Sequence, residues 1–301
     1  MREELDSKIV VTGGSGFIGS HMVQCLKKHS YTNITVVDVV LPKSGEVKFV
    51  KADFGDISTL DRVLDDAKYV FHFAAMVGVD KCRLHPDDVY RVNDTNTKKF
   101  IDLCVIKGVK RFIFSSSSET YGNSKDIPYR EDGVPEPFSD YAKCKISIEK
   151  YLQHVSNYSK MTVGVVRLFN IYGIGQKKDF VVSIFVDKAL RDQPLTILGD
   201  GEQTRCFTYV EDAVEGIFKT FRYIDTQFEI FNIGNPKEYT INQLANLVLE
   251  VVSDSSSEII HVRNSCFDIK RRVPNVDKAK EILSFSATTS LKAGLIKVYE
   301  H

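Results

Sequence analysis

The sequence predicts an α/β fold, a doubly wound parallel sheet with a smaller mixed α/β lobe at its C-terminal end. Short runs rich in β-branched residues alternate with stretches of helical periodicity across residues 8–173, and this alternation is typical of parallel βαβ units. The strand-like runs are apolar along most of their length, as in strands that helices cover on both faces. Beyond residue 173, loop-rich segments separate shorter elements, which indicates the second lobe.

Each expected element follows from a local pattern. The helix after the first strand, for example, places Met22, Val23 and Leu26 on one face. The helix over 88–108 ends at a glycine, which is suited to capping it. A late strand-like run, 228–234, is expected to return to the sheet. The other expected strands are residues 8–14, 33–40, 47–53, 69–75, 110–118 and 161–173, and the expected helices are residues 19–30, 57–67, 88–108 and 139–158.

Composition excludes several classes of protein. Apolar residues make up 43% and charged residues 27%, as in soluble globular proteins, and 40 basic residues balance 40 acidic ones. That balance does not favour nucleic acid or an anionic membrane as a partner. No apolar run reaches the roughly 18 residues of a membrane helix, and the charged N-terminus does not resemble a signal peptide.

Cysteine usage indicates a reducing compartment. The six cysteines are scattered, with no CxxC pair and no Cys/His pair at the usual metal-ligand spacing, so we expect free thiols, a cytoplasmic location and no metal site. These cysteines are Cys25, Cys82, Cys104, Cys144, Cys206 and Cys266.

The segment "TGGSGFIG" (12–19) places Gly13, Gly16 and Gly19 three residues apart, between the first strand and the first helix. In a dinucleotide-binding loop, such glycines allow a sharp turn, a close approach of the backbone to pyrophosphate, and tight packing of helix on strand. The helix N-terminus then offers N–H groups to the phosphates. The motif alone is a weak signal, because a tight turn that binds nothing can share it. Its position between a strand and a helix favours a Rossmann-type nucleotide site.

Acidic residues at strand ends indicate which dinucleotide binds. Asp38 ends the second expected strand, where a carboxylate accepts both ribose hydroxyls of NAD and repels the 2′-phosphate of NADP. Asp53 either accepts from the adenine amino group or is a surface turn residue. The candidate cofactor-binding residues are Gly13, Gly16, Phe17, Ile18, Gly19, Asp38, Asp53, Phe54, Phe73, Ala74, Ala75, Tyr141 and Lys145.

The segment "YAKCK" supplies a candidate base. Tyr141 and Lys145 are four residues apart and therefore share one helical face. A free tyrosine has a pKa of about 10, too high for a base at neutral pH. We expect the Lys145 ammonium and a positive nicotinamide ring to favour the phenolate and to lower that pKa.

Taken together, these motifs resemble the extended short-chain dehydrogenase/reductases that act on nucleotide sugars, namely NAD-dependent epimerases, dehydratases and decarboxylases. The resemblance covers nearly the whole chain, in the family's order and spacing. The matching segments are TGGSGFIG, HFAA, FSSSSETYG, YAKCK, RLFNIYGIGQ, GDGEQTRCFTYVEDAVEG, FNIGNP and DIKRRVPNVDKAK.

The resemblance implies a role for each matching residue. Tyr141 would take the proton of the sugar 4-hydroxyl, Lys145 would hold the nicotinamide ribose, and Ser117 would hydrogen-bond the same hydroxyl. The C4 hydride would pass to NAD⁺ and leave a 4-keto sugar. The implied substrate-binding residues are Ser118, Asn170, Arg205 and Arg272, the two arginines on the diphosphate. Asn93 matches a family asparagine, and we expect it to make a buried structural hydrogen bond.

Glu119 leaves the reaction open. Simple 4-epimerases usually have a small or apolar residue at this position, whereas 4,6-dehydratases use a glutamate to remove the C5 proton. The Ser-Ser-Glu run is also close to the Thr-Ser-Glu of UDP-glucuronate decarboxylases. Alternatively, Glu119 orients a loop. We rank a 4-epimerase first, a dehydratase or decarboxylase that uses Glu119 second, and a net C4 dehydrogenase third.

The resemblance also implies the domain organisation. Residues 1–170 are expected to form the NAD-binding domain, with about 206–234 returning to it, while 171–205 and 235–301 form the nucleotide-sugar lobe. The expected partners are a nucleotide-diphosphate sugar and a second copy of the chain, paired through the helices at 88–107 and 140–157. An NAD-sensing protein without catalysis is the alternative from another class, but such a protein should have lost Tyr141 or Lys145.

Overall fold

A computed structural model describes residues 2–42, 47–78, 82, 84–223, 225–263 and 269–301. The chain forms two compact units. The first contains Met1–Gly122, Val134–Arg167 and Val214–Phe231. The second contains Asn123–Gly133, Leu168–Ala213 and Asn232–His301. This division differs from the expected boundaries, because residues 123–133 join the second unit and 206–213 do not return to the first.

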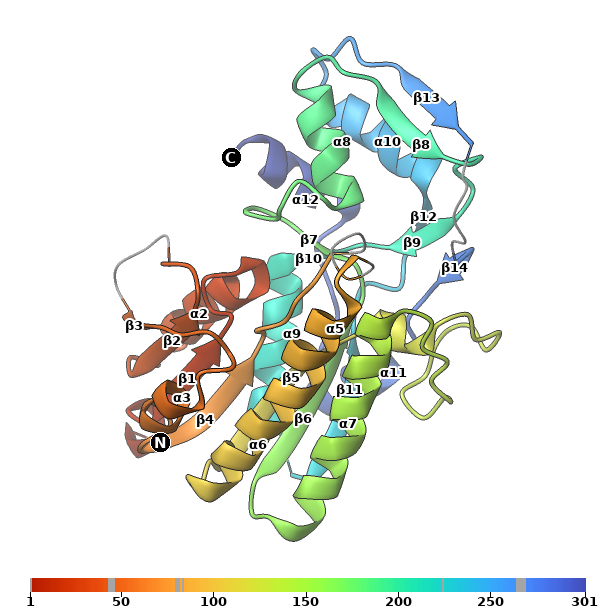
Figure 1. Cartoon of the computed structure of the whole chain (residues 1–301). Helices are drawn as coiled ribbons and strands as arrows, with labels where there is room; N and C mark the ends of the chain where they lie inside the picture. Colours follow the sequence, from red (N-terminus) through yellow and green to blue (C-terminus); the bar gives the residue numbers. More distant parts are fainter. Residues whose placement is uncertain (1, 43–46, 79–81, 83, 224, 264–268) are drawn as a thin grey trace. The chain divides into compact units, whose positions relative to one another are not determined.

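The first unit is built on a seven-stranded sheet with the strand order β11-β6-β5-β4-β1-β2-β3 (Figure 1). The pairs β1–β2, β1–β4, β2–β3 and β4–β5 are parallel. This order is that of doubly wound dinucleotide-binding folds, so the predicted fold class is confirmed. The late strand β11 lies beside β6, as expected. The strands are β1 Lys8–Thr12, β2 Ile34–Asp38, β3 Lys48–Lys51, β4 Ala67–His72, β5 Arg111–Ser117, β6 Thr162–Leu168 and β11 Phe228–Ile233.

Three helices cover one face of this sheet, where Figure 1 shows α6 and α7 side by side. Their buried side chains, among them Leu60, Phe100 and Leu152, pack with Val70 and Phe112 of the strands into one apolar core. These helices are α3 Ile57–Val63, α6 Thr97–Ile106 and α7 Asp140–Tyr158.

The helices α2 (Phe17–Lys28) and α9 (Val210–Tyr223) lie on the opposite face. Phe221 of α9 packs edge-on against Tyr69 and at a tilt against Phe71, both on β4. Because side chains alternate along a strand, Val70 between them faces the other core. Both faces of β4 are therefore covered, which explains its consecutive apolar residues Tyr69, Val70 and Phe71.

The helix expected over 88–108 is interrupted. It consists of α5 (Pro86–Tyr90), a π-helical segment (Arg91–Asn96) and α6. A π-helical turn widens the helix, and such turns occur often at functional sites. Helix α6 ends at Ile106 with Lys107 as its C-cap, and Gly108 follows with a φ of +70°, which confirms the expected glycine at the C-terminal end of the helix.

The second unit consists of small sheets and helices. β9 pairs antiparallel with β12 and parallel with β14, β10 pairs with β7, and β13 with β8. The strand expected over 161–173 breaks into β6 and β7 at Asn170, which has a φ of +38°. The elements are β7 Ile171–Tyr172, α8 Val181–Ala189, β8 Leu195–Leu198, β9 Thr204–Cys206, β10 Thr208–Tyr209, β12 Glu238–Thr240, α10 Ile241–Val251, β13 Ile259–Val262, β14 Arg271–Arg272, α11 Asp277–Leu283 and α12 Leu291–Tyr299. The short helix α1, Arg2–Leu5, precedes β1 in the first unit.

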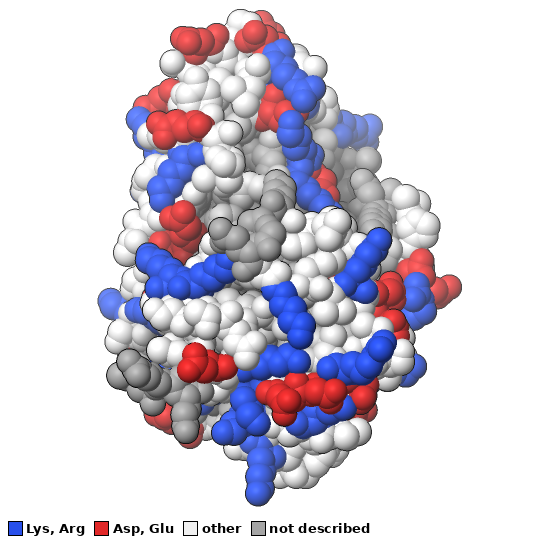
Figure 2. Space-filling view, turned by 90° about the vertical axis from the view of Figure 1, so that its left-hand side faces the viewer, with Lys and Arg blue, Asp and Glu red and all other residues white. Residues whose placement is uncertain are grey.

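Charges of both signs are mixed on the face shown in Figure 2, in keeping with the balanced composition. Within the described residues, no helix combines the length and hydropathy that crossing a bilayer requires. Five cysteines are buried free thiols, and Cys266 lies outside the described residues.

Candidate functional site

The glycine loop leaves no room for side chains. Gly13 has a φ of +68°, and a Cβ there would lie 2.6 Å from the backbone N of Ala74. A Cβ on Gly19 would lie 2.2 Å from the carbonyl O of Gly13. The loop therefore packs directly on the end of β4 and on the first turn of α2, as the motif predicts.

The same loop leaves polar groups open to a ligand. The N-cap of α2 is Gly16, which has no side chain to bond the first free N–H groups of the helix, including that of Gly19, and the first turn holds no acidic residue. The Ser15 hydroxyl is buried and has no hydrogen-bond partner among the described residues. Phe17 and Ile18, which open the helix, are half-buried. These donors fit the pyrophosphate of a dinucleotide.

Asp38 ends β2 beside this loop. Its carboxylate accepts hydrogen bonds from the backbone N–H groups of Ser15, at 3.0 Å, and Val40, at 3.1 Å. Ladder pairing of β1 with β2 brings the end of β2 next to the loop after β1. The half-buried carboxylate is thus held where a ribose is expected.

The other predicted cofactor residues divide into two groups. Phe73, Ala74 and Ala75 follow β4 and are half-buried, as expected of a surface that a cofactor crosses. Asp53 is exposed, and its carboxylate accepts from the backbone N–H of Gly55, which is the geometry of a surface turn. Phe54 is buried, with its ring 4.8 Å from that of His72 and 4.9 Å from that of Phe100. It belongs to the apolar core.

Asn93 supports the segment after β4. Its side-chain amide donates to the carbonyl O of Met76 at 2.9 Å and accepts from the Met76 N–H at 2.7 Å. Asn93 lies in the π-helical segment and is 3% exposed. The expected buried structural hydrogen bond is confirmed, and it fixes the backbone next to Ala74 and Ala75.

Tyr141 and Lys145 lie on the first turns of α7. The Ser139 hydroxyl caps this helix by accepting from the Ala142 N–H at 3.1 Å. The Lys145 Nζ lies 5.4 Å from the centroid of the Tyr141 ring and donates to the carbonyl O of Ser115 at 2.7 Å. The two side chains share one helical face, beside the end of β5, as their spacing predicts.

Burial dominates the electrostatics of this pair. Burial and the nearby Glu119 carboxylate raise the pKa of Tyr141 above its ordinary value, against a smaller opposing effect of a hydrogen bond with Ser117. Burial lowers the pKa of Lys145 to about 8. The chain by itself therefore keeps Tyr141 protonated, because desolvation disfavours both charged forms.

The loop after β5 brings Ser117, Ser118 and Glu119 together. Ser117 begins the short 3₁₀ helix Ser118–Tyr121, and its hydroxyl accepts from the Glu119 N–H at 3.2 Å. Ser118 is 2% exposed. The Glu119 carboxylate accepts from the Ser139 hydroxyl at 2.9 Å. Glu119 thus contacts the cap of α7 and also acts electrostatically on Tyr141.

A buried ion pair that the sequence did not predict lies next to this loop. Arg167 of β6 donates to the Glu149 carboxylate at 2.7 Å, and both side chains are almost fully buried. The Ser116 hydroxyl donates to the same carboxylate, and the Arg167 guanidinium lies 4.7 Å from the centroid of the Tyr121 ring. The sequence did carry one signal for a buried Glu149, because this residue is four positions after Lys145 and therefore on the same helical face.

The predicted substrate residues Asn170, Arg205 and Arg272 belong to the second unit. Asn170 donates through Nδ2 to the carbonyl O of Cys206 at 3.0 Å. Arg205 donates to the carbonyl O atoms of Thr204 and Ile269, both at 2.8 Å. The two arginines lie on paired strands, where Arg272 is opposite Arg205 in the register.

Arg272 has a further property that fits an anion. Its Nε is buried and has no hydrogen-bond partner among the described residues. A buried guanidinium N–H without a partner is costly, and a phosphate oxygen would satisfy it.

A family model described as the NAD dependent epimerase/dehydratase family matches residues 9–234. Among curated proteins, UDP-glucuronic acid decarboxylase 2 of Arabidopsis thaliana is 33% identical over 299 residues. That match covers 96% of this chain and 66% of the relative, so the chain spans about two thirds of the relative's length.

Two solved structures are similar throughout. The UDP-glucose 4-epimerase of Thermotoga maritima, solved with UDP-glucose, is 32% identical with a TM-score of 0.92, and the match covers 97% of both chains. The UDP-glucuronic acid 4-epimerase of Bacillus cereus, solved with UDP-glucuronic acid and NAD, is 28% identical with a TM-score of 0.89. This second match covers 97% of this chain and 98% of the other.

Proposed function

Since the chain belongs to the NAD-dependent epimerase/dehydratase family, we propose that it oxidises the C4 hydroxyl of a UDP-sugar and returns the hydride to the opposite face, as a 4-epimerase. The family is NAD-dependent, and the chain is an enzyme of this family. Relatives that act on nucleotide sugars include both decarboxylases and 4-epimerases. The choice of a 4-epimerase and of a UDP-sugar is therefore the proposal.

One observation carries this proposal, the placement of Ser117, Tyr141 and Lys145 in the same unit as the glycine loop. Ser117 ends β5, and the other two lie on α7 at the same edge of the sheet. In doubly wound folds, ligands bind outside the carboxyl ends of the strands. A hydroxyl, a phenol and an ammonium are thus collected where the nicotinamide end of a dinucleotide would lie.

The residues have distinct roles in the proposed reaction. Tyr141 accepts the proton of the C4 hydroxyl through its phenolic oxygen, and Ser117 holds the same hydroxyl. A bound NAD⁺ would supply the acceptor for the C4 hydride and a positive charge near the phenol. Lys145, mostly protonated at neutral pH with a pKa of about 8, stabilises the phenolate. Without that combined positive charge, burial and Glu119 keep the phenol protonated.

The second unit would hold the nucleotide. Arg272, whose buried Nε has no hydrogen-bond partner within the described part of the chain, is the candidate for a direct contact with the diphosphate. Arg205 is committed through Nη1 to two backbone carbonyls, so it both fixes the strand pair and adds positive charge. Asn170, at the break between β6 and β7, would contact the bound sugar nucleotide.

Decarboxylation of a UDP-hexuronate is the second candidate, and Glu119 favours it. A C4 ketone makes the C6 carboxylate of such a sugar a β-keto acid, so the C5–C6 bond can break with loss of CO₂. The bonding pair passes into an enolate, C5 then takes a proton, and the hydride removed from C4 would return to the ketone to give a UDP-pentose. Glu119 acts electrostatically on Tyr141, and it is bonded through Ser139 to the cap of the helix that carries that phenol. It is therefore a candidate for carrying that proton.

The test is incubation of the protein with UDP-glucose and UDP-glucuronic acid in D₂O, followed by NMR of the products. A C4 epimer with every carbon-bound hydrogen still protiated supports the proposal. A UDP-pentose with deuterium at C5 would replace it by the decarboxylase. Deuterium at C5 with loss of the 6-hydroxyl would indicate a dehydratase, and release of a 4-keto sugar a dehydrogenase. A protein that binds NAD and turns over no nucleotide sugar would contradict all of these.

A further inference from the structure

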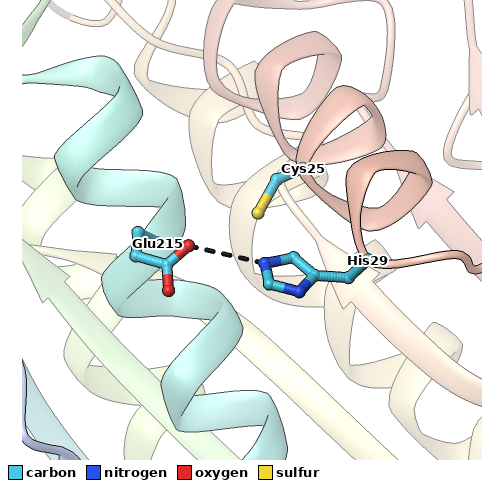
Figure 3. Close-up of side chains that lie close together, drawn as sticks. All are labelled: Cys25, His29 and Glu215. Atoms are coloured by element: carbon cyan, nitrogen blue, oxygen red, sulfur yellow. Dashed lines mark ion pairs between the residues drawn. The ribbon is translucent and has the colours of Figure 1, made fainter.

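Three possible metal ligands converge outside the candidate active site, on the face of the sheet that α2 and α9 cover. Cys25 lies on the last turns of α2, His29 directly follows that helix, and Glu215 lies on α9. Figure 3 shows the three side chains pointing toward one another from these two helices. All three belong to the first unit.

The distances are close to those of a coordination shell. Cys25 and His29 are four residues apart and share one helical face. The His29 Nε2 lies 3.6 Å from Glu215 Oε2, and the three ligand atoms all lie within 4.8 Å of one another. With zinc bonds of about 2.0–2.3 Å, a tetrahedral ion places its ligand atoms roughly 3.3–3.6 Å apart. Closing the shell therefore needs movements of about an ångström.

The surroundings of His29 and Cys25 favour metal binding. The His29 ring stacks on Phe218, with 3.8 Å between centroids and 14° between planes, and this stacking fixes the direction of Nε2. The Cys25 thiol has no hydrogen-bond partner among the described residues. In contrast, the thiols of Cys82 and Cys144 each contact a backbone carbonyl. The Cys25 sulfur is thus available to a ligand.

The burial of the three groups suits a bound ion. Cys25 is 8% exposed, whereas the side chains of His29 and Glu215 are 36% and 43% exposed. An ion can therefore enter from solvent, bind at the inner sulfur and keep a water as its fourth ligand. A set of sulfur, imidazole and carboxylate donors is typical of zinc and its neighbours in the transition series, and not of magnesium or calcium.

We propose that Cys25, His29 and Glu215 form a binding site for a divalent ion of the zinc class, which joins α2 to α9. Binding forms metal bonds to sulfur, nitrogen and oxygen, and the thiol proton passes to solvent without any change of oxidation state. The ion stabilises the packing of the helix that carries the glycine loop. This inference is independent of the reaction proposed above, since none of the three residues lies among the candidate catalytic residues.

The experiment uses the full chain after dialysis against a chelator, titrated with Co²⁺ and then with Zn²⁺. We expect one equivalent of Co²⁺ to produce a thiolate-to-cobalt charge-transfer band in the near ultraviolet, and Zn²⁺ to displace it. Zn²⁺ should also raise the midpoint of thermal unfolding, because an ion that binds only the folded chain stabilises it. A missing band at a twofold excess of cobalt would overturn the proposal.

Variants separate this site from adventitious binding. Cys25→Ser should abolish the charge-transfer band, and Glu215→Gln, at a half-buried position, should weaken Zn²⁺ binding at least tenfold. The matched controls are Glu211→Gln on the same helix, whose carboxylate pairs with Lys297, and Cys144→Ser. Both variants should keep the charge-transfer band and the Zn²⁺ affinity of the wild type. A band that persists in Cys25→Ser, or equal losses in the controls, would show that binding occurs elsewhere.

Discussion

The Lys145 ammonium lies 5.4 Å from the centre of the Tyr141 ring, one helical turn farther along α7. Both groups are desolvated, so the pKa of Tyr141 is raised and that of Lys145 is lowered to about 8. The two side chains are thus placed for the reaction, but burial still disfavours the phenolate form of Tyr141. A positive charge brought by a bound dinucleotide would favour that form, which makes the state of Tyr141 depend on cofactor binding.

Removing the phenol should stop the reaction and leave the cofactor site intact. Tyr141→Phe deletes the only atom proposed to take the C4 proton, so we expect kcat to fall about a hundredfold or more while NAD still binds. Turnover assays and equilibrium dialysis against NAD measure the two effects. The control is Tyr151→Phe, farther along α7, whose phenol bonds Asp102. Turnover of Tyr141→Phe at the wild-type rate would refute the assigned base.

Glu119→Gln should separate an electrostatic role from a chemical one. The Glu119 carboxylate raises the pKa of Tyr141, so its neutral amide should lower that pKa. Because the base works deprotonated, the acidic limb of the kcat/KM profile should move to lower pH. If instead Glu119 carries the C5 proton, the variant loses turnover at every pH while still oxidising C4, which a transient NADH absorbance would reveal.

Lys145→Met should change how stability depends on pH. The folded pKa of Lys145, about 8, lies below its ordinary value of 10.5, so between these values the unfolded chain holds one more proton. The free energy of unfolding of the wild type should therefore rise relative to Lys145→Met, by about 1.4 kcal/mol per pH unit in this window. Below pH 8 the difference should be constant. Urea unfolding between pH 7 and 10.5 measures it, with exposed Lys150→Met as the control. A flat difference across the window would contradict the shift.

Breaking the buried ion pair should be costly. Glu149→Gln leaves the Arg167 guanidinium buried without its counter-charge, and such a loss typically costs about 3–5 kcal/mol. The double variant Glu149→Gln with Arg167→Met should lose less than the sum of the singles, because no isolated charge remains. Urea denaturation measures both. Asp140→Asn, which breaks the exposed pair with Lys143, should hardly shift the curve. Additive single losses would argue against direct coupling.

Filling the glycine loop should remove cofactor binding. A Cβ at position 19 would lie 2.2 Å from the Gly13 carbonyl, so Gly19→Ala must displace the turn that approaches the pyrophosphate. We expect NAD affinity to fall by more than tenfold, with a smaller loss of stability. Equilibrium titration with NAD is the measurement, and Ser20→Ala on the next, exposed position is the control. Unchanged affinity in Gly19→Ala would place the dinucleotide elsewhere.

Local patterns predicted the fold and the motifs that lie within one turn or loop. The alternation of strands and helices, the glycine loop and the spacing of Tyr141 and Lys145 are short-range features, and their geometry follows from the periods of helix and strand. The cap at Gly108 belongs to the same class, since one residue with positive φ ends the helix.

Contacts between residues that are far apart in the chain could not be predicted from the sequence. Glu149 and Arg167 lie on different elements, and only the sheet order brings them together in a buried pair. Cys25 and Glu215 are likewise brought together because α2 and α9 pack on one face. Phe54 was expected at the cofactor and lies in the core, since its direction depends on what packs around it.

The sequence alone determined that this chain is a doubly wound nucleotide-binding fold with a tyrosine and a lysine on one helical face. The tertiary structure decided the direction in which the pKa values of those residues are shifted, and the partners of Glu119. The reason is physical: periodicity and glycine placement act over a few residues along the chain, whereas burial and Coulomb interactions depend on every group that folding brings near.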